Sequence, residues 1–374
     1  MIKFWSYKKE YLKYKKKILG GVDKSLKSGS IFFSNELVTF EKSFVKKYKT
    51  KYGIAVGSGT DAITIAIKSL NIKPGDEIIT AANTAIPTIT AIINAGAKPK
   101  LVDIGDDYLI DVTKIEKEIN LRTKAIIPVH LYGQTCEMDT IIKIARKNKI
   151  QIIEDCAQSQ GSLYRNKYAG TIGKLGCFSF YPTKILGAYG DGGFILTNDY
   201  KVYKKIKRLR FYGIETEENN KYKNKYYSFE NGYNSRLDEM QASILNFKLR
   251  KVDSFIKKRR NLAKIYIKEL SATKLILPEE KSNNKHVYNL FTVSHSKRIQ
   301  LIQQLAKKNI YTRIIYPYPI QNMKAYKNMI NNKNRLKNSV KKSKEIFCLP
   351  LYPELSVKEV MHVCRSLKEI LKKI

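Results

Sequence analysis

Short apolar runs alternate with amphipathic stretches along the first half of the chain. Within the longer stretches, apolar positions recur at the spacing of one helix face. The pattern predicts the strands Ile54–Val56, Glu77–Thr80, Pro99–Val102, Ala125–Val129 and Ile150–Ile153. Because these strands are mostly apolar and helices separate them, they indicate a mostly parallel sheet that is covered on both faces.

Amphipathic helices are predicted between and after these strands. They are Glu36–Tyr48, Ala62–Leu70, Ala85–Asn94, Val112–Ile119, Met138–Asn148, Lys201–Tyr212, Leu237–Val252, Lys297–Lys308 and Val357–Leu371. Two more strands, Leu175–Phe180 and Gly192–Leu196, flank a turn-rich loop. Val287–Val293 and Tyr311–Ile315 are predicted as strands of the C-terminal part. Met1–Ser30 is predicted as an arm that packs on the protein body or on a partner subunit, with a loose N-terminal extension as the alternative.

The chain has 374 residues, more than the ~250–300 at which one hydrophobic core stops growing. We therefore predict two domains. Residues 1–250 would form the N-terminal arm and a large domain on the parallel sheet, and residues 251–374 a bridging helix and a smaller C-terminal α/β domain.

The chain is strongly basic, with 70 Lys and Arg, 33 Asp and Glu, and a formal net charge of +37. Such an excess raises nucleic acid or an anionic membrane as partners. The lysines, however, are scattered through nearly every segment, and no nucleic-acid-binding motif is apparent. We expect no nucleic-acid partner, and a positive field that favours small anionic substrates.

The five cysteines show neither a disulfide framework nor the spacing of metal ligands. The sequence therefore predicts a reducing compartment and no bound metal. Residues 1–17 lack the apolar core of a signal peptide, and no run reaches the ~18 apolar residues of a membrane span. We expect a cytoplasmic protein without a membrane partner.

The segment 173–197 presents Lys184 on a glycine-rich loop between two predicted strands. Glycines allow close approach of backbone, which can enclose a side chain. An enclosed lysine can have a lowered pKa, and its free amine can form a Schiff base with a carbonyl cofactor. The alternative is a surface loop whose lysine is solvated like most others in this chain.

The run Gly57–Asp61 follows a predicted strand and opens a helix. Small residues at a helix N-terminus offer free N–H groups and the positive end of the helix dipole, so the run is a candidate anion site. Taken alone, the segment favours the alternative of an ordinary helix start that Ser58 or Thr60 caps.

Ligands of parallel α/β sheets bind outside the carboxyl ends of the strands. Polar residues follow three predicted strands: Asn83 and Thr84, His130, and Glu154, Asp155 and Gln158. Asp155 has a functional role there if it faces a positive partner; otherwise an Asp after a strand is a cap or turn residue. An anion site, a carboxylate and an enclosed lysine are the parts that pyridoxal 5'-phosphate needs for its phosphate, ring nitrogen and aldehyde.

Nearly the whole chain resembles the sugar aminotransferases of the DegT/DnrJ/EryC1/StrS family. The resemblance rests on GSGTDA (57–62), GDEIITAANT (75–84), VHLYGQ (129–134), IIEDCAQSQG (152–161), FSFYPTKILGAYGDGG (178–193), GYNSRLDEMQASIL (232–245) and LPLYPELS (349–356). It implies the type I aminotransferase fold and pyridoxal 5'-phosphate as cofactor. The runs FYG (211–213) and YNSRLDE (233–239) are most similar to enzymes that aminate C3 of dTDP-linked 3-keto-6-deoxyhexoses.

The resemblance implies roles for three residues around the cofactor ring. Lys184 would be the Schiff-base lysine and the base that moves the proton between cofactor and substrate. Asp155 would bind the pyridinium nitrogen, and Gln158 would lie near the phenolic oxygen. The role of Asp155 is chemically consistent, because a carboxylate keeps the ring nitrogen protonated.

The resemblance also implies the phosphate contacts. Gly59, Thr60 and Asp61 would hold the phosphate, largely through backbone N–H groups, together with the hydroxyl of Ser179. Asn234 would reach the phosphate of the neighbouring subunit's cofactor. The resemblance therefore implies a homodimer with shared active sites.

Two positions depart from the family's pattern. This chain has Ala85 where many relatives carry an aromatic residue that stacks on the ring, and Gln321 where relatives often have His. Tyr316, Tyr318 and Gln321 are candidate contacts to the sugar nucleotide, with a structural aromatic turn as the alternative. The loop 213–232 is longer than usual.

The implied function is transfer of an amino group from L-glutamate, which becomes 2-oxoglutarate, to a dTDP-linked 3-keto-6-deoxyhexose. Amination at C4 and UDP-linked substrates are alternatives within the family. A sugar dehydratase is disfavoured, because those relatives replace the lysine that stands here as Lys184. A non-catalytic regulator that binds the cofactor or a sugar nucleotide is an alternative of a different class.

Overall fold

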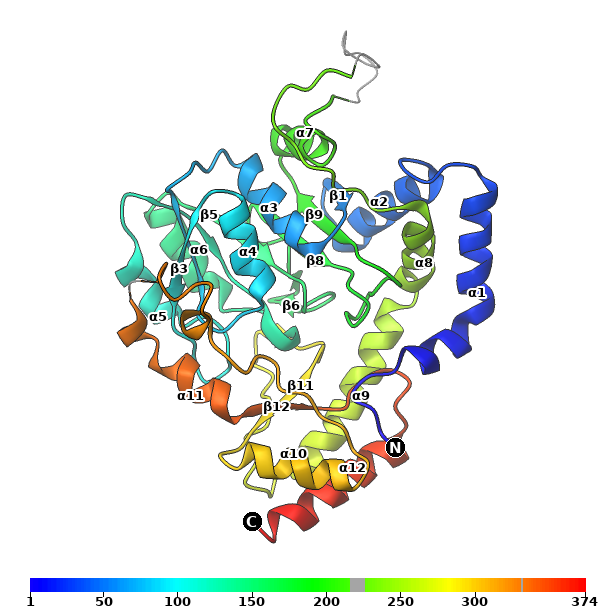
Figure 1. Ribbon diagram of the computed structural model, residues 1–374, viewed down its shortest axis with the longest axis vertical. Coiled ribbons are helices and arrows are strands. Elements are labelled where there is room, and N and C mark those ends of the chain that lie inside the picture. Colours follow the sequence, from blue (N-terminus) through cyan, green and yellow to red (C-terminus); the bar gives the residue numbers. More distant parts are fainter. Residues whose placement is uncertain (216–225, 331) are drawn as a thin grey trace.

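The computed structural model describes residues 1–215, 226–330 and 332–374. Its larger part is a layered α/β domain, and a smaller part lies below it in the view of Figure 1. The predicted long loop 213–232 falls partly outside the described residues. The predicted domain boundary after residue 250 falls between the helices α8 (Glu239–Leu249) and α9 (Val252–Leu270).

The central sheet has seven strands in the order β1-β9-β8-β5-β4-β2-β3. They are β1 Tyr52–Val56, β2 Glu77–Ala81, β3 Lys98–Val102, β4 Thr123–Ile127, β5 Gln151–Asp155, β8 Leu175–Ser179 and β9 Gly193–Thr197. The pairs from β3 through β2, β4 and β5 to β8 are parallel, whereas β9 is antiparallel to β8 and β1. The prediction of a mostly parallel sheet is confirmed. The exception, β9, follows β8 through a loop that turns back instead of a crossover helix.

Helices cover this sheet, and several of them start at side-chain caps. Those of the large domain besides α8 are α2 Asn35–Tyr48, α3 Gly59–Ser69, α4 Ile86–Asn94, α5 Val112–Ile115, α6 Met138–Lys147 and α7 Tyr200–Leu209. Ser58, Asp199 and Asp238 cap α3, α7 and α8 by accepting backbone N–H bonds. α3 packs on β8 and β9, while α2 and α8 enclose a second apolar cluster that includes Phe40 and Phe178.

The smaller domain is built on a two-stranded antiparallel sheet of β11 (Phe291–Ser294) and β12 (Ile346–Leu349). Around it lie α9, α10 (Arg298–Lys307), α11 (Lys337–Glu345) and α12 (Val357–Leu371). The predicted strand Tyr311–Ile315 is wrong, because β12 pairs with β11 and Arg313 forms only an isolated bridge to Cys348. The strand β12 was not predicted although its four residues are apolar, because it continues from α11 without a turn residue.

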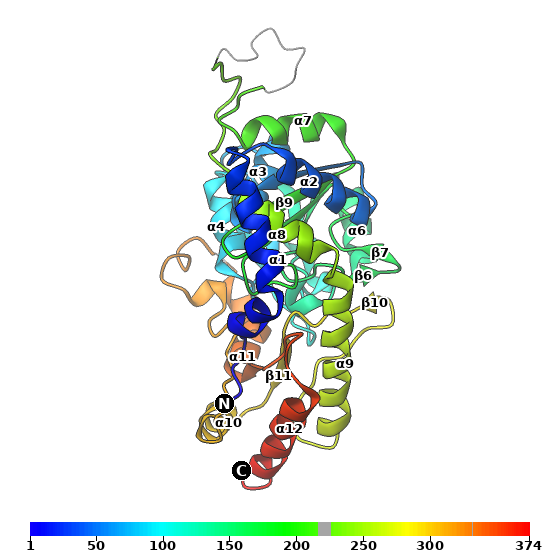
Figure 2. The same cartoon turned by 90° about the vertical axis from the view of Figure 1, so that its right-hand side faces the viewer.

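The N-terminal arm is a helix, α1 (Tyr7–Lys27), that packs on α8 and lies in front of it in Figure 2. Ahead of α1, Ile2 pairs with Ile310 and Trp5 packs against the core of the small domain. The arm therefore contacts both parts of the protein. Its helical period was hidden in the sequence by the many lysines and tyrosines between its apolar positions.

A small ribbon also connects the two parts. β10 (Asn284–Lys285) pairs with β6 (Leu163–Tyr164), which pairs with β7 (Lys167–Tyr168). None of the helices in the described ranges has the length and apolar character that a bilayer crossing needs.

Candidate active site

Lys184 lies on the loop between β8 and β9, and hydrogen bonds within the loop hold its shape. The N–H of Phe180 donates to the carbonyl of Gly192 at 2.7 Å. At Gly187, an added Cβ would lie 2.4 Å from the carbonyl oxygen of Pro182, so the loop closes in this form only with glycine there. The glycine-rich sequence thus builds a defined support for the lysine.

The amine of Lys184 has no hydrogen bond or ion pair with the residues that the structure describes. Burial lowers its pKa to about 8, and the negative charge of Asp155 works against this shift. A larger fraction of this amine is therefore unprotonated at neutral pH than of an ordinary lysine, whose pKa is about 10.4. This property supports a nucleophilic lysine over a solvated loop residue.

Asp155 ends β5, and only 4% of its surface is exposed. One carboxylate oxygen accepts from the hydroxyl of Thr88 at 2.8 Å, and the other accepts from the N–H of Ala157 at 3.1 Å. Both of these donors are neutral. No cation among the described residues forms an ion pair with Asp155. A buried carboxylate in this setting is matched best by a positively charged ligand group, such as a protonated ring nitrogen.

Gln158 links the end of β5 to two tyrosines. Its Oε1 accepts from the N–H of Tyr132 at 2.8 Å, and its Nε2 donates to the hydroxyl of Tyr316 at 3.0 Å. The hydroxyl of Tyr132 donates in turn to the carbonyl of Ile315. The fold thereby brings Tyr316 of the C-terminal part to the residues that follow β5.

The start of α3 and the end of β8 meet at Gly59. An added Cβ at Gly59 would lie 2.6 Å from the Cβ of Ser179. Ser58 caps the helix by accepting from the N–H of Asp61 at 3.1 Å, which leaves the N–H groups of Gly59 and Thr60 without an acceptor in their own helix. These N–H groups and the nearby hydroxyl of Ser179 make a suitable place for an anion. The interpretation as a capped helix is correct for Ser58, and the anion site stays a prediction that is compatible with this cap.

Asp61 is fixed by the segment that carries Asn234. The hydroxyl of Ser235 donates to the Asp61 carboxylate at 2.8 Å and accepts from the N–H of Gly57 at 2.9 Å. Asn234 itself is exposed, and its backbone forms an isolated bridge to Phe211. Within one chain, Ser235 rather than Asn234 reaches the start of α3.

The remaining candidates are exposed or partly exposed, or have structural contacts. Tyr318 is 66% exposed. Gln321 is buried, and its Nε2 donates to the hydroxyl of Ser339 at 2.9 Å and to the carbonyl of Leu336. Ala85 precedes α4 and is partly exposed, so the fold places no aromatic side chain at this position.

His130 and Glu154, noted at strand ends, form a buried network with Cys156 in which the potential ligand atoms lie within 4.8 Å of one another. Nε2 of His130 donates to Glu154 at 2.9 Å, and Nδ1 accepts from the N–H of Cys136 at 3.1 Å. Glu154 also accepts from the backbone N–H groups of Gly170, Ile172 and Gly173. These hydrogen bonds account for the burial of His130 and Glu154 without a metal, and we assign no metal to the cluster.

Three residues at the site were not singled out in the sequence. Thr88 gives a weak signal as a polar position in the otherwise apolar run that forms α4. Ser235 lies beside Asn234 in the run YNSRLDE. Tyr132 has a positive φ of 60°, an uncommon conformation that the sequence does not reveal.

Residues 13–368 match the DegT/DnrJ/EryC1/StrS aminotransferase family. This chain belongs to that family. A family member from Aneurinibacillus thermoaerophilus, dTDP-3-amino-3,6-dideoxy-alpha-D-galactopyranose transaminase, is 39% identical and covers 98% of both chains. The dTDP-3-amino-3,4,6-trideoxy-alpha-D-glucose transaminase of Micromonospora megalomicea subsp. nigra is 36% identical, again over 98% of both chains.

A solved structure of this family, that of S. venezuelae DesV in complex with a ketimine intermediate, has a TM-score of 0.95 to the chain. It is 32% identical, and the match covers 100% of this chain and 99% of the other. The predictions of the family, of the type I aminotransferase fold and of an enzyme that uses pyridoxal 5'-phosphate are confirmed.

The residues of the site fit this cofactor. The amine of Lys184 has a lowered pKa, the buried carboxylate of Asp155 has neutral donors, and the start of α3 offers free N–H groups. These are the chemical counterparts of an aldehyde, a protonated ring nitrogen and a phosphate. The DegT/DnrJ/EryC1/StrS aminotransferase family therefore accounts for features that were derived from the residues independently.

Proposed function

We propose that the enzyme transfers an amino group from L-glutamate to C3 of a dTDP-linked 3-keto-6-deoxyhexose. The products are a dTDP-3-amino-3,6-dideoxyhexose and 2-oxoglutarate. The observation that carries the proposal is the similarity, along 98% of the chain, to two enzymes named as dTDP-3-amino sugar transaminases. The basic composition supports it as well, since a net charge of +37 favours a pyrophosphate-bearing substrate.

The names of the relatives support amination at C3 rather than C4 more strongly than they support dTDP rather than UDP as the nucleotide. Two relatives at 34% identity are named for UDP-linked sugars, and their names also place the dehydro or oxo group at C3. We therefore retain a UDP-linked 3-keto sugar as the nearer alternative, and C4 amination as the more distant one.

In this proposal each residue acts by a property already described. The cofactor supplies an aldehyde and an electron-withdrawing ring. The amine of Lys184 takes up and returns the proton that moves during transfer, which a pKa of about 8 permits near neutral pH. Asp155 holds the ring nitrogen, while the N–H groups of Gly59 and Thr60 and the hydroxyl of Ser179 hold the phosphate.

We further propose that the active unit is a homodimer. Asn234 is exposed in the single chain, whereas its neighbour Ser235 is buried at the start of α3. An exposed amide beside this site is available to a second copy of the chain.

A regulatory protein is the candidate function of a different class, because a relative at 36% identity is named a pleiotropic regulatory protein. That relative matches 96% of this chain, so overall similarity does not separate the two functions. The lowered pKa of Lys184 and its position near Asp155 favour catalysis, since a protein that only binds a ligand has no need of a nucleophilic amine.

The substrate is tested with the purified enzyme, pyridoxal 5'-phosphate and L-glutamate. Four acceptors are compared: the dTDP-linked 3-keto and 4-keto 6-deoxyhexoses and their UDP-linked counterparts. We expect the dTDP-linked 3-keto sugar to have the highest kcat/KM, with its amino product identified by mass spectrometry and NMR. A higher kcat/KM for a UDP-linked or 4-keto sugar would replace the proposed substrate, and no transfer to any of the four would remove the sugar-nucleotide proposal.

A further inference from the structure

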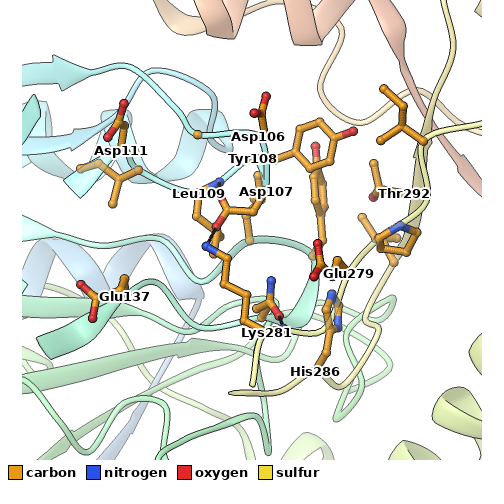
Figure 3. A pocket seen from close by; sticks show the side chains of 18 of the residues that line it. Asp106, Asp107, Tyr108, Leu109, Asp111, Glu137, Glu279, Lys281, His286 and Thr292 are labelled. Carbon is orange, nitrogen blue, oxygen red and sulfur yellow. Dashed lines mark hydrogen bonds and ion pairs between the residues drawn. The ribbon is translucent and has the colours of Figure 1, made fainter. Parts of the chain in front are cut away.

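A cavity of about 410 Å³ lies between the large and the small domain. Its walls come from residues 105–112 after β3, residues 131–137 after β4, and residues 276–292, which lead into β11 (Figure 3). None of the residues proposed to contact the cofactor lines it. The cavity is therefore separate from the site around Lys184.

The walls are mainly apolar and aromatic. The rings of Tyr108 and Tyr132 are 5.8 Å apart and nearly perpendicular, and Leu131, Pro278 and Leu290 also line the cavity. Its volume lies within the ~300–1,000 Å³ typical of pockets for small molecules. A flat or chair-shaped ring of moderate size suits such walls.

His286 presents one hydrogen-bond donor to this space. Its side chain is 3% exposed, stacks on Tyr288 and lies in the cavity beside Glu279 and Lys281 in Figure 3. Nδ1 accepts from the N–H of Tyr288 at 2.9 Å, so the proton of the neutral ring is on Nε2. Burial, together with the charge of Arg260, lowers the pKa of His286 to about 3, which keeps the ring neutral. Nε2 has no hydrogen bond to the described residues.

Gln134 presents a second donor. Its side chain is 4% exposed and lines the cavity, and its Oε1 accepts from the N–H of Lys281 at 3.0 Å. The amide nitrogen of Gln134 has no hydrogen bond to any side chain or backbone group in the described ranges. Two donors that face the cavity without protein acceptors are available to an occupant that carries acceptors of its own.

The charged residues around the cavity indicate which net charge of a ligand the cavity can accept. Asp107 forms an ion pair with Lys281, and both residues line the cavity. Asp106 and Asp111 are paired with Lys342 and Lys114, at 3.0 Å each. An anionic ligand therefore meets several carboxylates and, among the described lining residues, no unpaired cation. A cationic ligand meets the two donors His286 and Gln134.

We propose that this cavity is a binding site for a small uncharged ring compound whose acceptors take the hydrogen bonds of His286 Nε2 and Gln134 Nε2. The ring would lie against Tyr108 and Tyr132. An uncharged sugar or a cyclic amide has the required combination of a partly apolar ring and oxygen acceptors.

The site is also connected to the catalytic residues. The ring of Tyr132 lines the cavity, while its N–H donates to Gln158 at 2.8 Å and its hydroxyl to Ile315. Tyr132 therefore contacts both an occupant of the cavity and the side-chain amide of Gln158. This connection rests on the role near the phenolic oxygen that the family resemblance implies for Gln158, whereas binding in the cavity does not.

The proposal is tested with three probes of nearly equal size: neutral benzamide, anionic benzoate and cationic benzamidine. Binding to the full-length holoenzyme is measured by saturation-transfer NMR with titration. We expect benzamide to bind saturably and at least about fivefold more tightly than either charged probe, an effect of the size expected for one or two hydrogen bonds. Absence of saturable benzamide binding, or equal binding of a charged probe, overturns the proposal.

Two variants locate the bound probe. Gln134→Glu keeps the acceptor for Lys281 N–H but replaces the amide donor, and His286→Asn keeps an acceptor for Tyr288 N–H but removes the Nε2 donor. Each is expected to weaken benzamide binding about fivefold to tenfold. Glu279→Gln is the control, since Glu279 is exposed at the cavity and donates no hydrogen bond to the ligand.

The variants are compared only after their far-UV and near-UV circular dichroism match that of the wild type. If His286→Asn and Gln134→Glu both bind benzamide as tightly as the wild type, the assigned donors are wrong and the proposal is overturned. Because no readout in this experiment involves the cofactor or amino transfer, its result is independent of the proposed aminotransferase substrate.

Discussion

The hydroxyl of Thr88 donates a hydrogen bond to the carboxylate of Asp155 at 2.8 Å. This bond joins the first turn of α4 to the end of β5. The N–H of Ala157 supports the other carboxylate oxygen. Because these donors are neutral, they orient the carboxylate without cancelling the charge that the cofactor ring requires.

Replacement of Thr88 by Val therefore tests the orientation of Asp155. The change keeps the shape of the side chain but removes a hydrogen bond to a charged group, which contributes about 1.5–3 kcal/mol. We expect kcat/KM to fall roughly tenfold to a hundredfold, corresponding to that free energy. Thr88→Ser, which keeps the hydroxyl, should retain most of the activity. Equal losses in the two variants would contradict an orienting role for the hydroxyl.

The pH dependence of cofactor capture tests the pKa of Lys184. Burial lowers this pKa to about 8, so the rate at which the apoprotein captures pyridoxal 5'-phosphate should rise with pH through a midpoint near 8. Asp155 raises the pKa of Lys184, so Asp155→Asn should move the midpoint to lower pH. Stopped-flow absorbance measures both. A wild-type midpoint near that of free lysine, or an upward shift in Asp155→Asn, would contradict the assignment.

Mixed dimers test whether Asn234 serves the site of the other subunit. Lys184→Ala and Asn234→Ala are each expected to be nearly inactive alone. If Asn234 acts across the interface, a hybrid of the two has one site with both residues intact. Random reassembly should restore about a quarter of wild-type activity, because half of the dimers are hybrids with one working site. No recovery in hybrids isolated by two affinity tags would show that Asn234 acts within its own chain or that the dimer is wrong.

The contact between Gly59 and Ser179 predicts a steric cost at the start of α3. An added Cβ at Gly59 would lie 2.6 Å from Ser179 Cβ, so Gly59→Ala should destabilise the protein by about 1–3 kcal/mol and weaken cofactor binding. Gly20→Ala is the control, because Gly20 lies inside α1 with no atom within 4 Å of the added Cβ. The control should gain about 0.5–1 kcal/mol. Urea unfolding measures both, and a neutral Gly59→Ala would refute the close contact.

The sequence predicted those features of the structure that depend on residues close together in the chain. The parallel strands, the loop of Lys184 and the carboxylate of Asp155 at a strand end could be predicted, because apolar period and strand-end chemistry are local properties. Thr88 could not, since its role depends on α4 and β5 lying side by side. The strand β12 was missed for a similar reason: its pairing with β11 joins residues far apart in the chain, and α11 runs directly into it.

The substrate-side residues were harder to predict, because a turn motif does not specify which side chains point inward. Tyr316 reaches Gln158, whereas Gln321 of the same segment turns toward Ser339. Side-chain direction there depends on packing between the segment and its neighbours, which composition and spacing do not encode.

The central claim, a catalytic Lys184 in an aminotransferase, is tested most directly by the first half of the reaction alone. Stoichiometric enzyme with bound pyridoxal 5'-phosphate is mixed with L-glutamate, and 2-oxoglutarate and pyridoxamine 5'-phosphate are quantified by mass spectrometry. The account predicts about one equivalent of each per wild-type site, and no product within the same time from Lys184→Ala or Lys184→Arg. An equal yield from the Lys184 variants, or none from the wild type with any common amino donor, would contradict it.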